Sequence, residues 1–139
     1  EAVDLDAKLI NVGILESGIM ETPKNWNEAG WYERSSKVGS KGNIVINGHY
    51  DDDHGKPAAF YWLKNLKIGD KVFVSDELGR KYAYSVEESF FLDINDPSRL
   101  SVLSGAEDSH ELTLITCGGV WNSKLGTYNE RLVVKARLL

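Results

Sequence analysis

The sequence predicts a small closed or sandwich-like β fold, because short strand-like segments follow one another and few stretches show helical spacing. In these segments apolar and polar residues alternate or β-branched residues gather, and Gly, Asn and Asp tend to separate one segment from the next. We expect strands over residues 8–14, 43–47, 70–76, 81–87, 111–117 and 131–139.

The connections between these strands contain turns and little helix. The Glu-Leu-Gly-Arg turn at residues 77–80 predicts a hairpin between the strands on either side of it. Residues 57–66 begin with a proline and have apolar residues at helical spacing, which predicts a short helix built on Phe60, Leu63 and Leu66. We expect a second short helix over residues 97–103, and a loop with short helical turns over residues 20–42.

Length and composition indicate one globular domain over residues 1–139, with 42% hydrophobic and 27% charged residues. The net charge of −5 and the scattered Lys and Arg residues argue against a nucleic-acid partner. No apolar run approaches the roughly 20 residues needed to span a bilayer. We therefore expect that a membrane anchor, if there is one, lies outside this chain.

The chain contains one cysteine, Cys117, which closes an apolar strand and is followed by the pair Gly118-Gly119. A single cysteine excludes an intrachain disulfide and a zinc site of four thiolates. The remaining interpretations are a buried small hydrophobic residue and a nucleophile.

Alternation along the strands predicts that three polar side chains share one face. In the last strand one set is entirely apolar and is expected to face the interior: Leu132, Val134, Ala136 and Leu138. Arg131, Cys117 and His49 belong to the opposite sets of their own segments, so we expect them on the outer face. Because Cys117 ends its strand and Arg131 begins the next, antiparallel pairing would bring these two to the same end.

This set of residues suits covalent catalysis by a thiolate. A cysteine attacks a carbonyl far better as thiolate, and a nearby histidine can supply or accept the proton. An arginine offers a fixed fork of donors to a developing oxyanion or to substrate carbonyls.

Four segments resemble the sortases, the cysteine transpeptidases of Gram-positive cell surfaces. Residues 113–117, Thr-Leu-Ile-Thr-Cys, match the TLxTC signature of that family. Residues 43–49 resemble the strand that delivers the sortase histidine, and residues 60–74 resemble the stretch after it. Residues 131–136 resemble the strand that bears the sortase arginine. The resemblance extends over residues 8–139 and looks most like class F, with classes D and E as alternatives.

The resemblance implies an all-β fold, a closed eight-stranded sortase-type β-barrel with a few short helices in the loops and an active site in a groove on its outer wall. It implies that Cys117 attacks the Thr–Gly bond of an LPXTG-like sorting signal and forms a thioacyl enzyme. His49 would protonate the leaving amine and deprotonate the incoming one, and Arg131 would hold substrate carbonyls or the oxyanion. The acceptor would be an amine of a peptidoglycan cross-bridge or a pilin lysine, at the extracellular face of the cell membrane or in the cell wall.

Six further residues are expected on the substrate side of this site. One of them, Thr116, would contribute its hydroxyl or backbone N–H beside the oxyanion, although a β-branched residue that simply forms strand fits equally well. The others would form an apolar wall for the Leu and Pro of the signal or border the groove: Phe91, Leu92, Ile94, Leu100 and Trp121.

Other residues compete for these roles. His54 and His110 are alternatives to His49 as base, but neither follows a glycine in the matching context. Arg137 has the strand parity of Arg131, but it lies six residues further along, roughly 20 Å on an extended strand. We interpret the tryptophans of the first half of the chain as packing residues: Trp26, Trp31 and Trp62.

Residues 49–54 contain two His and three Asp, a composition that can bind a divalent cation. Charge runs in loops are usually solvated, and no further ligand cluster appears in the sequence. We therefore expect no metal and no cofactor.

Two other functions remain open at this point. A cysteine hydrolase on the same barrel would differ only in letting water resolve the thioester. A catalytically silent β-barrel would retain the peptide groove as a binding module, which the complete set of Cys117, His49 and Arg131 argues against.

Overall fold

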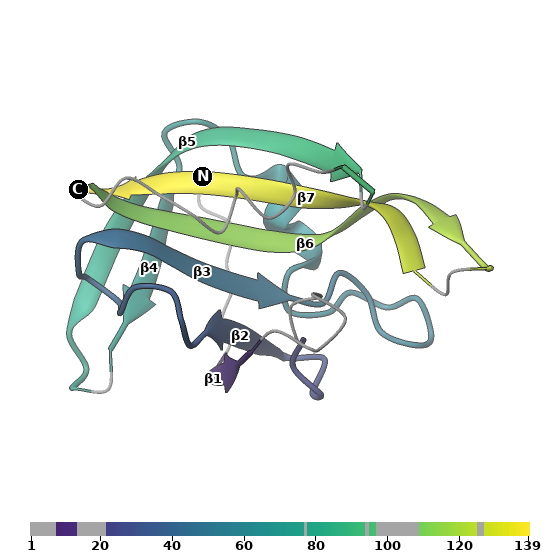
Figure 1. The fold of residues 1–139 in the computed structure, drawn as a ribbon, viewed down its shortest axis with the longest axis horizontal. Coiled ribbons are helices and arrows are strands. Elements are labelled where there is room, and N and C mark those ends of the chain that lie inside the picture. Colours follow the sequence, from purple (N-terminus) through teal and green to yellow (C-terminus); the bar gives the residue numbers. More distant parts are fainter. Residues whose placement is uncertain (1–7, 14–21, 77, 94, 97–108, 125–126) are drawn as a thin grey trace.

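Seven strands form one mixed sheet in the computed structural model, which describes residues 8–13, 22–76, 78–93, 95–96, 109–124 and 127–139 (Figure 1). The pairing order is β1-β2-β3-β6-β7-β5-β4. The strands are β1 Lys8–Val12, β2 Glu28–Tyr32, β3 Gly42–Gly48, β4 Lys71–Ser75, β5 Lys81–Asp93, β6 His110–Asn122 and β7 Thr127–Leu138. The 3₁₀ helix η1, Tyr61–Asn65, lies between β3 and β4. The all-β prediction is confirmed.

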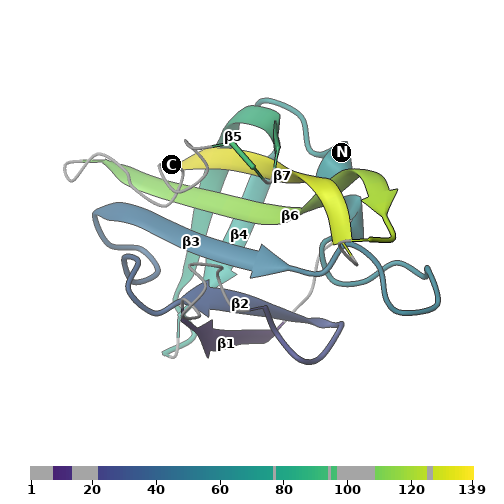
Figure 2. The same cartoon turned by 45° about the vertical axis from the view of Figure 1, so that its right-hand side comes forward.

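The expected closed barrel of eight strands is not what the described residues form. They contain seven strands, and the strands at the two ends of the pairing order, β1 and β4, do not pair with each other. Strand twist curls the sheet, so that β4 lies behind β3 in both views (Figures 1 and 2). Closure would require a hydrogen-bonded ladder between the two edges. The described part of the sheet encloses its core by curling.

The remaining differences from the sequence predictions lie in the connections and in the lengths of β5, β6 and β7, which extend beyond the predicted ranges 81–87, 111–117 and 131–139. Residues 20–42 were expected to form a loop, but they contain β2, whose five residues were too few to show alternation. The helix expected over residues 57–66 is the five-residue 3₁₀ helix η1. The helix expected over residues 97–103 lies outside the described residues.

The core lies inside the curl, as strand parity predicted. The even-numbered apolar residues of β6 and β7 are buried there against β3 and β4: Leu112, Leu114, Leu132, Val134, Ala136, Ile44, Ile46 and Val74. The opposite face of the central strands is also covered, since Val45, Thr113 and Val133 are at most 1% exposed. The Thr113 hydroxyl lies 2.7 Å from Asn43 Oδ1 and satisfies part of the polar content of that face.

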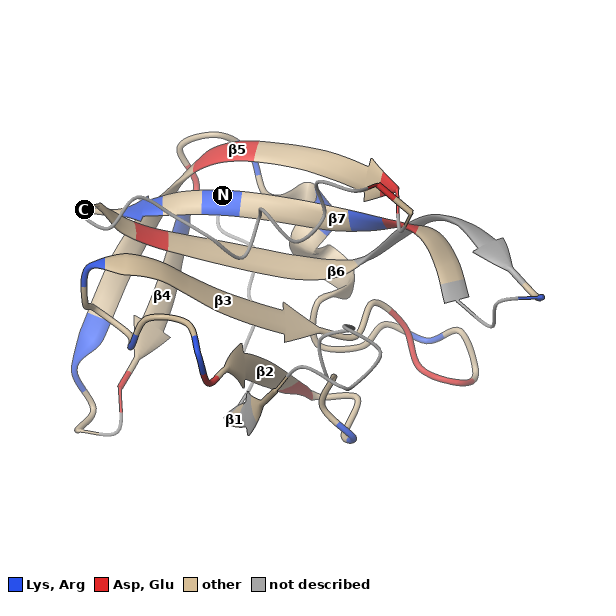
Figure 3. Ribbon diagram, in the orientation of Figure 1, with Lys and Arg blue, Asp and Glu red and all other residues tan. Residues whose placement is uncertain are grey.

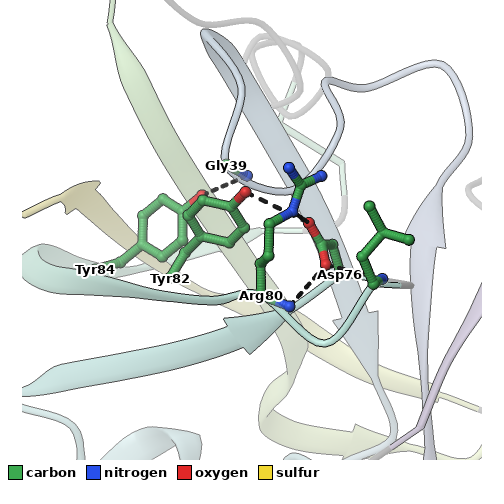
Figure 4. Close-up of polar contacts among 6 residues, drawn as sticks. Gly39, Asp76, Arg80, Tyr82 and Tyr84 are labelled. Atoms are coloured by element: carbon green, nitrogen blue, oxygen red, sulfur yellow. Dashed lines mark hydrogen bonds and ion pairs between the residues drawn. The ribbon is translucent and has the colours of Figure 1, made fainter.

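Tyr84 of β5 ties the loop that precedes β3 to the sheet (Figure 4). The N–H of Gly39, whose φ of +82° favours glycine, donates to the Tyr84 hydroxyl at 3.1 Å. Tyr84 is fully buried, and this burial raises the pKa of its phenol. In the nearby β4–β5 turn, the Asp76 carboxylate accepts from Arg80 Nε at 2.7 Å, which stabilises the hairpin predicted from the sequence.

Charged residues of both signs are interspersed along the ribbon (Figure 3), and the loop after β3 carries the acidic run. Within the described residues, no helix is both long and apolar enough to cross a membrane.

Candidate active site

His49, Cys117 and Arg131 lie on or directly after three adjacent strands: Cys117 is in β6, Arg131 is in β7 and His49 follows the last residue of β3. Strands β3 and β6 pair in parallel with Asn47 opposite Ile115. His49 and Cys117 each lie two residues beyond this last pair, and β3 ends at Gly48, so His49 is the first residue after the strand on that side of β6. Strands β6 and β7 are antiparallel, with Cys117 opposite Arg131, and the pairing expected for these two is confirmed. Neighbouring strands are about 4.8 Å apart, so the backbones of Cys117 and Arg131 are adjacent, and His49 follows the end of the strand on the other side of β6.

The imidazole of His49 is held by the segment that precedes β2. Its Nε2 lies 2.5 Å from the carbonyl oxygen of Pro23, a residue that is fully buried. A carbonyl can only accept, so Nε2 carries a proton and Nδ1 is the nitrogen that can exchange one. The ring of Trp26 packs edge-on against the imidazole, with ring centroids 4.5 Å apart.

The backbone at the end of β3 is fixed by close packing and by two hydrogen bonds. Phe60 packs so near Gly48 that a Cβ there would lie 2.7 Å from the Phe60 ring. The Phe60 N–H donates to the His49 carbonyl at 2.9 Å. The Thr116 hydroxyl donates to the Gly48 carbonyl at 2.8 Å. The backbone that carries His49 is thus held from η1 and from β6.

Thr116 therefore has a structural partner for its hydroxyl. It pairs with the core residue Leu132 and is 3% exposed, so its side chain points to the face opposite the one expected for Cys117. The hydroxyl therefore links β6 to the end of β3, and the role of Thr116 beside the oxyanion stays a prediction.

The guanidinium of Arg131 is oriented by backbone carbonyls at the start of β7. Its Nη1 donates to the carbonyl oxygens of Tyr128 and Glu130, both at 3.1 Å. The side chain is partly buried. These two contacts fix the plane of a group that has five N–H donors in total.

The residues expected on the substrate side do not all share one face of the sheet. Leu92 pairs with Arg131 across β5 and β7 and so shares its face. Phe91 pairs with Leu132, on the other face, and is 54% exposed. The backbone of Trp121 lies opposite Tyr128, in the extension of the β6–β7 ladder beyond Cys117. Ile94 and Leu100 lie outside the described residues.

The competing residues lie elsewhere. His110 begins β6 opposite Gly42, seven residues and roughly 23 Å along the strand from Cys117. His54 lies exposed in the acidic loop, 4.0 Å from Asp53. Arg137 pairs with Glu111 and forms an ion pair with Glu87 at 3.3 Å.

The acidic loop is shaped by its own hydrogen bonds. Asp52 Oδ1 accepts from the N–H groups of His54 and Lys56 at 2.8 and 2.9 Å. The hydrogen bond from Lys56 lowers the pKa of Asp52. Asp51 accepts from the Tyr128 hydroxyl at 2.6 Å. In the part of the chain that the structure describes, no three His, Cys, Asp or Glu side chains gather as a metal site would require.

Sequence reasoning missed Pro23, Trp26 and Tyr128 as neighbours of this site. Pro23 reaches His49 across 26 residues of sequence, through a backbone atom that carries no residue-specific signal. Trp26 was interpreted as packing, and it does pack, but against the imidazole.

Fold and site together define an all-β domain in which Cys117 of β6 pairs with Arg131 of β7, and His49 directly follows β3, the other neighbour of β6. The sortase domain family matches residues 3–139. The chain belongs to the sortase family, whose members are cysteine transpeptidases. No curated protein sequence matches it.

Solved sortase structures from three organisms are similar to this chain. Sortase A of Listeria monocytogenes is 25% identical, with a TM-score of 0.71 over 99% of this chain and 81% of that one. The sortase D5 transpeptidase of Clostridium perfringens is 27% identical, with a TM-score of 0.63 over 81% of this chain. Sortase C-1 of Actinomyces oris is 26% identical, with a TM-score of 0.64 over 80% of this chain. The chain spans only 62% and 56% of the length of the last two. Classes A, C and D are all represented, so the family is established at a level above the class.

Proposed function

We propose that this chain is the catalytic domain of a sortase-type transpeptidase that cleaves the Thr–Gly bond of an LPXTG-like sorting signal. The observation that supports this most strongly is the order of β3, β6 and β7 in the sheet, with Cys117 opposite Arg131 and His49 directly after β3. Family membership supports the reaction type, and the pairing of Cys117 with Arg131 supports the proposed location of the site.

The reaction proceeds in two acyl transfers. The Cys117 thiolate attacks the threonine carbonyl carbon and forms a C–S bond. The C–N bond to glycine then breaks as the imidazolium of His49 donates its Nδ1 proton to the leaving amine. In the second transfer, neutral Nδ1 accepts a proton from the incoming amine, whose nitrogen attacks the thioester carbonyl and releases the thiolate. The Pro23 carbonyl keeps the other nitrogen protonated throughout.

Arg131 stabilises the charge that develops on the substrate. Its guanidinium is held at Nη1 by two backbone carbonyls, so its plane is set before the substrate arrives. Preorganised donors of this kind stabilise an oxyanion without reorganising during the reaction. Leu92, on the same face as Arg131, is our candidate for contact with the apolar residues of the signal.

The substrates and the place of action follow from the family and belong to the same proposal. The acyl donor is a surface protein that carries the sorting signal. The acceptor is an amine of a peptidoglycan cross-bridge or a pilin lysine. The reaction takes place at the cell envelope, on the extracellular face of the membrane or in the cell wall. We keep class F as the proposed class, on the basis of the Cys-Gly-Gly run at residues 117–119.

Incubation with an LPXTG peptide and triglycine, followed by mass spectrometry of the products, tests this function. We expect a ligated product with the wild-type chain and none with Cys117→Ala. A hydrolysed peptide without ligation would indicate a hydrolase. No product at all, together with a Cys117 that reacts with thiol reagents no faster than free cysteine, would refute catalysis and favour a binding module.

A further inference from the structure

We propose that Tyr128 is a positioning residue that sets the distance between His49 and Arg131 through a hydrogen bond to Asp51. This inference rests on the proposed function and extends it to a residue outside the catalytic set. Tyr128 lies near the start of β7, three residues before Arg131, and Asp51 lies two residues after His49.

The hydroxyl of Tyr128 donates to Asp51 Oδ2 at 2.6 Å, and both residues are partly buried. A hydrogen bond from a hydroxyl to a carboxylate at this distance is about twice as strong as one between two neutral groups. The backbone of Asp51 is itself fixed, because it forms an isolated β-bridge with Pro57. The Tyr128–Asp51 hydrogen bond therefore joins β7 to a position in the loop after His49 whose backbone is held by the bridge to Pro57.

The backbone and the ring of Tyr128 make two more contacts that reach both sides of the site. Its carbonyl oxygen accepts from Arg131 Nη1 at 3.1 Å. Its ring meets the ring of Tyr50, the residue next to His49, with centroids 5.6 Å apart and planes at 81°. Tyr128 thus touches the guanidinium through its backbone and the histidine loop through its side chain.

Tyr50 also contacts Tyr61 and Lys64, and these contacts fix the position of its ring. The rings of Tyr50 and Tyr61 stack with centroids 4.8 Å apart. Lys64 Nζ donates to the Tyr50 hydroxyl at 2.9 Å. Strand β7 is consequently held against a packed aromatic group that extends back to η1.

These contacts are expected to fix the distance between His49 and Arg131, which lie on either side of the strand that carries Cys117. The histidine loop and the start of β7 flank β6 on opposite sides, and register alone leaves the loop beyond Gly48 without a ladder partner in β6. A displacement of about 1 Å in a catalytic group can cost on the order of 100-fold in rate. Loss of the Tyr128–Asp51 bond should therefore lower kcat while KM for the sorting peptide changes little.

The matched variants are Tyr128→Phe and Asp51→Ala, with Asp51→Asn as the conservative replacement that keeps an acceptor oxygen. We expect about a 10-fold loss of kcat for Tyr128→Phe and for Asp51→Ala, which is less than the roughly 100-fold loss for a catalytic group displaced by about 1 Å. Asp51→Asn should recover part of it, and the double variant should be no slower than either single one. Tyr82→Phe is the control, since it removes another Tyr–Asp contact, at 3.4 Å, in the distant hairpin.

A second readout does not depend on the sorting peptide. Cys117 is the only cysteine in the chain, so the rate of alkylation by iodoacetamide reports on that thiol alone. We expect the pH–rate profile of Tyr128→Phe to move toward that of His49→Ala, and that of Tyr82→Phe to match wild type.

The two readouts separate the possible failures. If the wild-type chain ligates the peptide and Tyr128→Phe does so with an unchanged kcat, the positioning role is wrong and the proposed function stands. If the wild-type chain does not ligate, the proposed function fails and the alkylation profile alone decides the positioning role. A Tyr128→Phe profile identical to wild type would overturn that role.

Discussion

Replacing Tyr84 with phenylalanine tests how the fold holds the loop before β3. The substitution keeps the buried ring and removes only the hydroxyl that accepts from the Gly39 N–H. An intramolecular hydrogen bond of this kind contributes about 1 kcal/mol net to stability. We therefore expect Tyr84→Phe to lower the free energy of unfolding by about 1 kcal/mol.

The corresponding shift in melting temperature follows from the size of the chain. The entropy of unfolding is about 2.1 cal/mol/K per residue, which gives about 0.3 kcal/mol/K for a domain of this length. A loss of about 1 kcal/mol then lowers Tm by about 3 °C. Differential scanning calorimetry at pH 8 measures this directly.

The pH dependence provides an independent check. Burial raises the pKa of Tyr84 above that of an unfolded tyrosine, so the folded state keeps its proton to higher pH. The stability that this group contributes is complete below about pH 10 and is lost as the pH rises through the folded pKa. Phenylalanine does not titrate, so the difference between wild type and Tyr84→Phe should shrink above about pH 10.

Tyr82→Phe is the matched control for Tyr84→Phe, since Tyr82 is only partly buried and its hydroxyl contact is 3.4 Å long. We expect it to change Tm by less than about 1 °C, as a weak surface contact should. Equal shifts for the two variants, or a Tyr84→Phe difference that grows above pH 10, would refute the reasoning.

Three further substitutions test other parts of the account. Gly48→Ala forces a Cβ within 2.7 Å of the Phe60 ring, so urea unfolding should show a loss of about 1–3 kcal/mol; an unchanged midpoint would mean that the ring yields freely. Trp26→Ala removes an edge-on contact of about 1 kcal/mol from His49 and should lower kcat for ligation about fivefold, with Trp26→Phe close to wild type; equal rates for the two would contradict an orienting role. Asp52→Ala removes the acceptor of two loop N–H groups, and because the pKa of Asp52 is lowered in the fold, the resulting Tm difference should be present at pH 7, begin to shrink as the pH falls below about 4 and be lost as the pH falls through the folded pKa; a difference that grows as the pH falls below about 4 would exclude this cause.

Strand parity carried most of the information about the fold. The alternation in the last two strands identified the core face, because β6 and β7 are long and a wrong parity would bury charged residues such as Arg131 and Lys135. Strand β2 was missed because its five residues include Gly30 and lie in a segment rich in turn-forming residues. Its pairing with β1 and β3 depends on residues distant in the sequence.

The candidate site was predictable where it depends on strand pairing and unpredictable where it depends on loops. Antiparallel pairing alone brought Cys117 and Arg131 together. The contact between His49 and the Pro23 carbonyl depends on how the chain enters β2, and no pattern in residues 20–42 encodes it. The number of strands was taken from a family resemblance, and the open edges at β1 and β4 are a property of the described fold that periodicity does not report.

The assignment of the catalytic residues can be tested by comparing each with its competitor in the same chain. We would measure the initial rate of ligation of an LPXTG peptide to triglycine for His49→Ala beside His54→Ala, and for Arg131→Ala beside Arg137→Ala. Loss of a catalytic acid–base group typically costs about 10²- to 10⁴-fold, which we expect for His49→Ala, and loss of an oxyanion donor costs about 10²- to 10³-fold, which we expect for Arg131→Ala. The exposed His54 and the ion-paired Arg137 should remain within about twofold of wild type, as substitutions away from a site do. A His49→Ala or Arg131→Ala variant that ligates at the wild-type rate would contradict the proposed site at the ends of β3 and β6 and the start of β7.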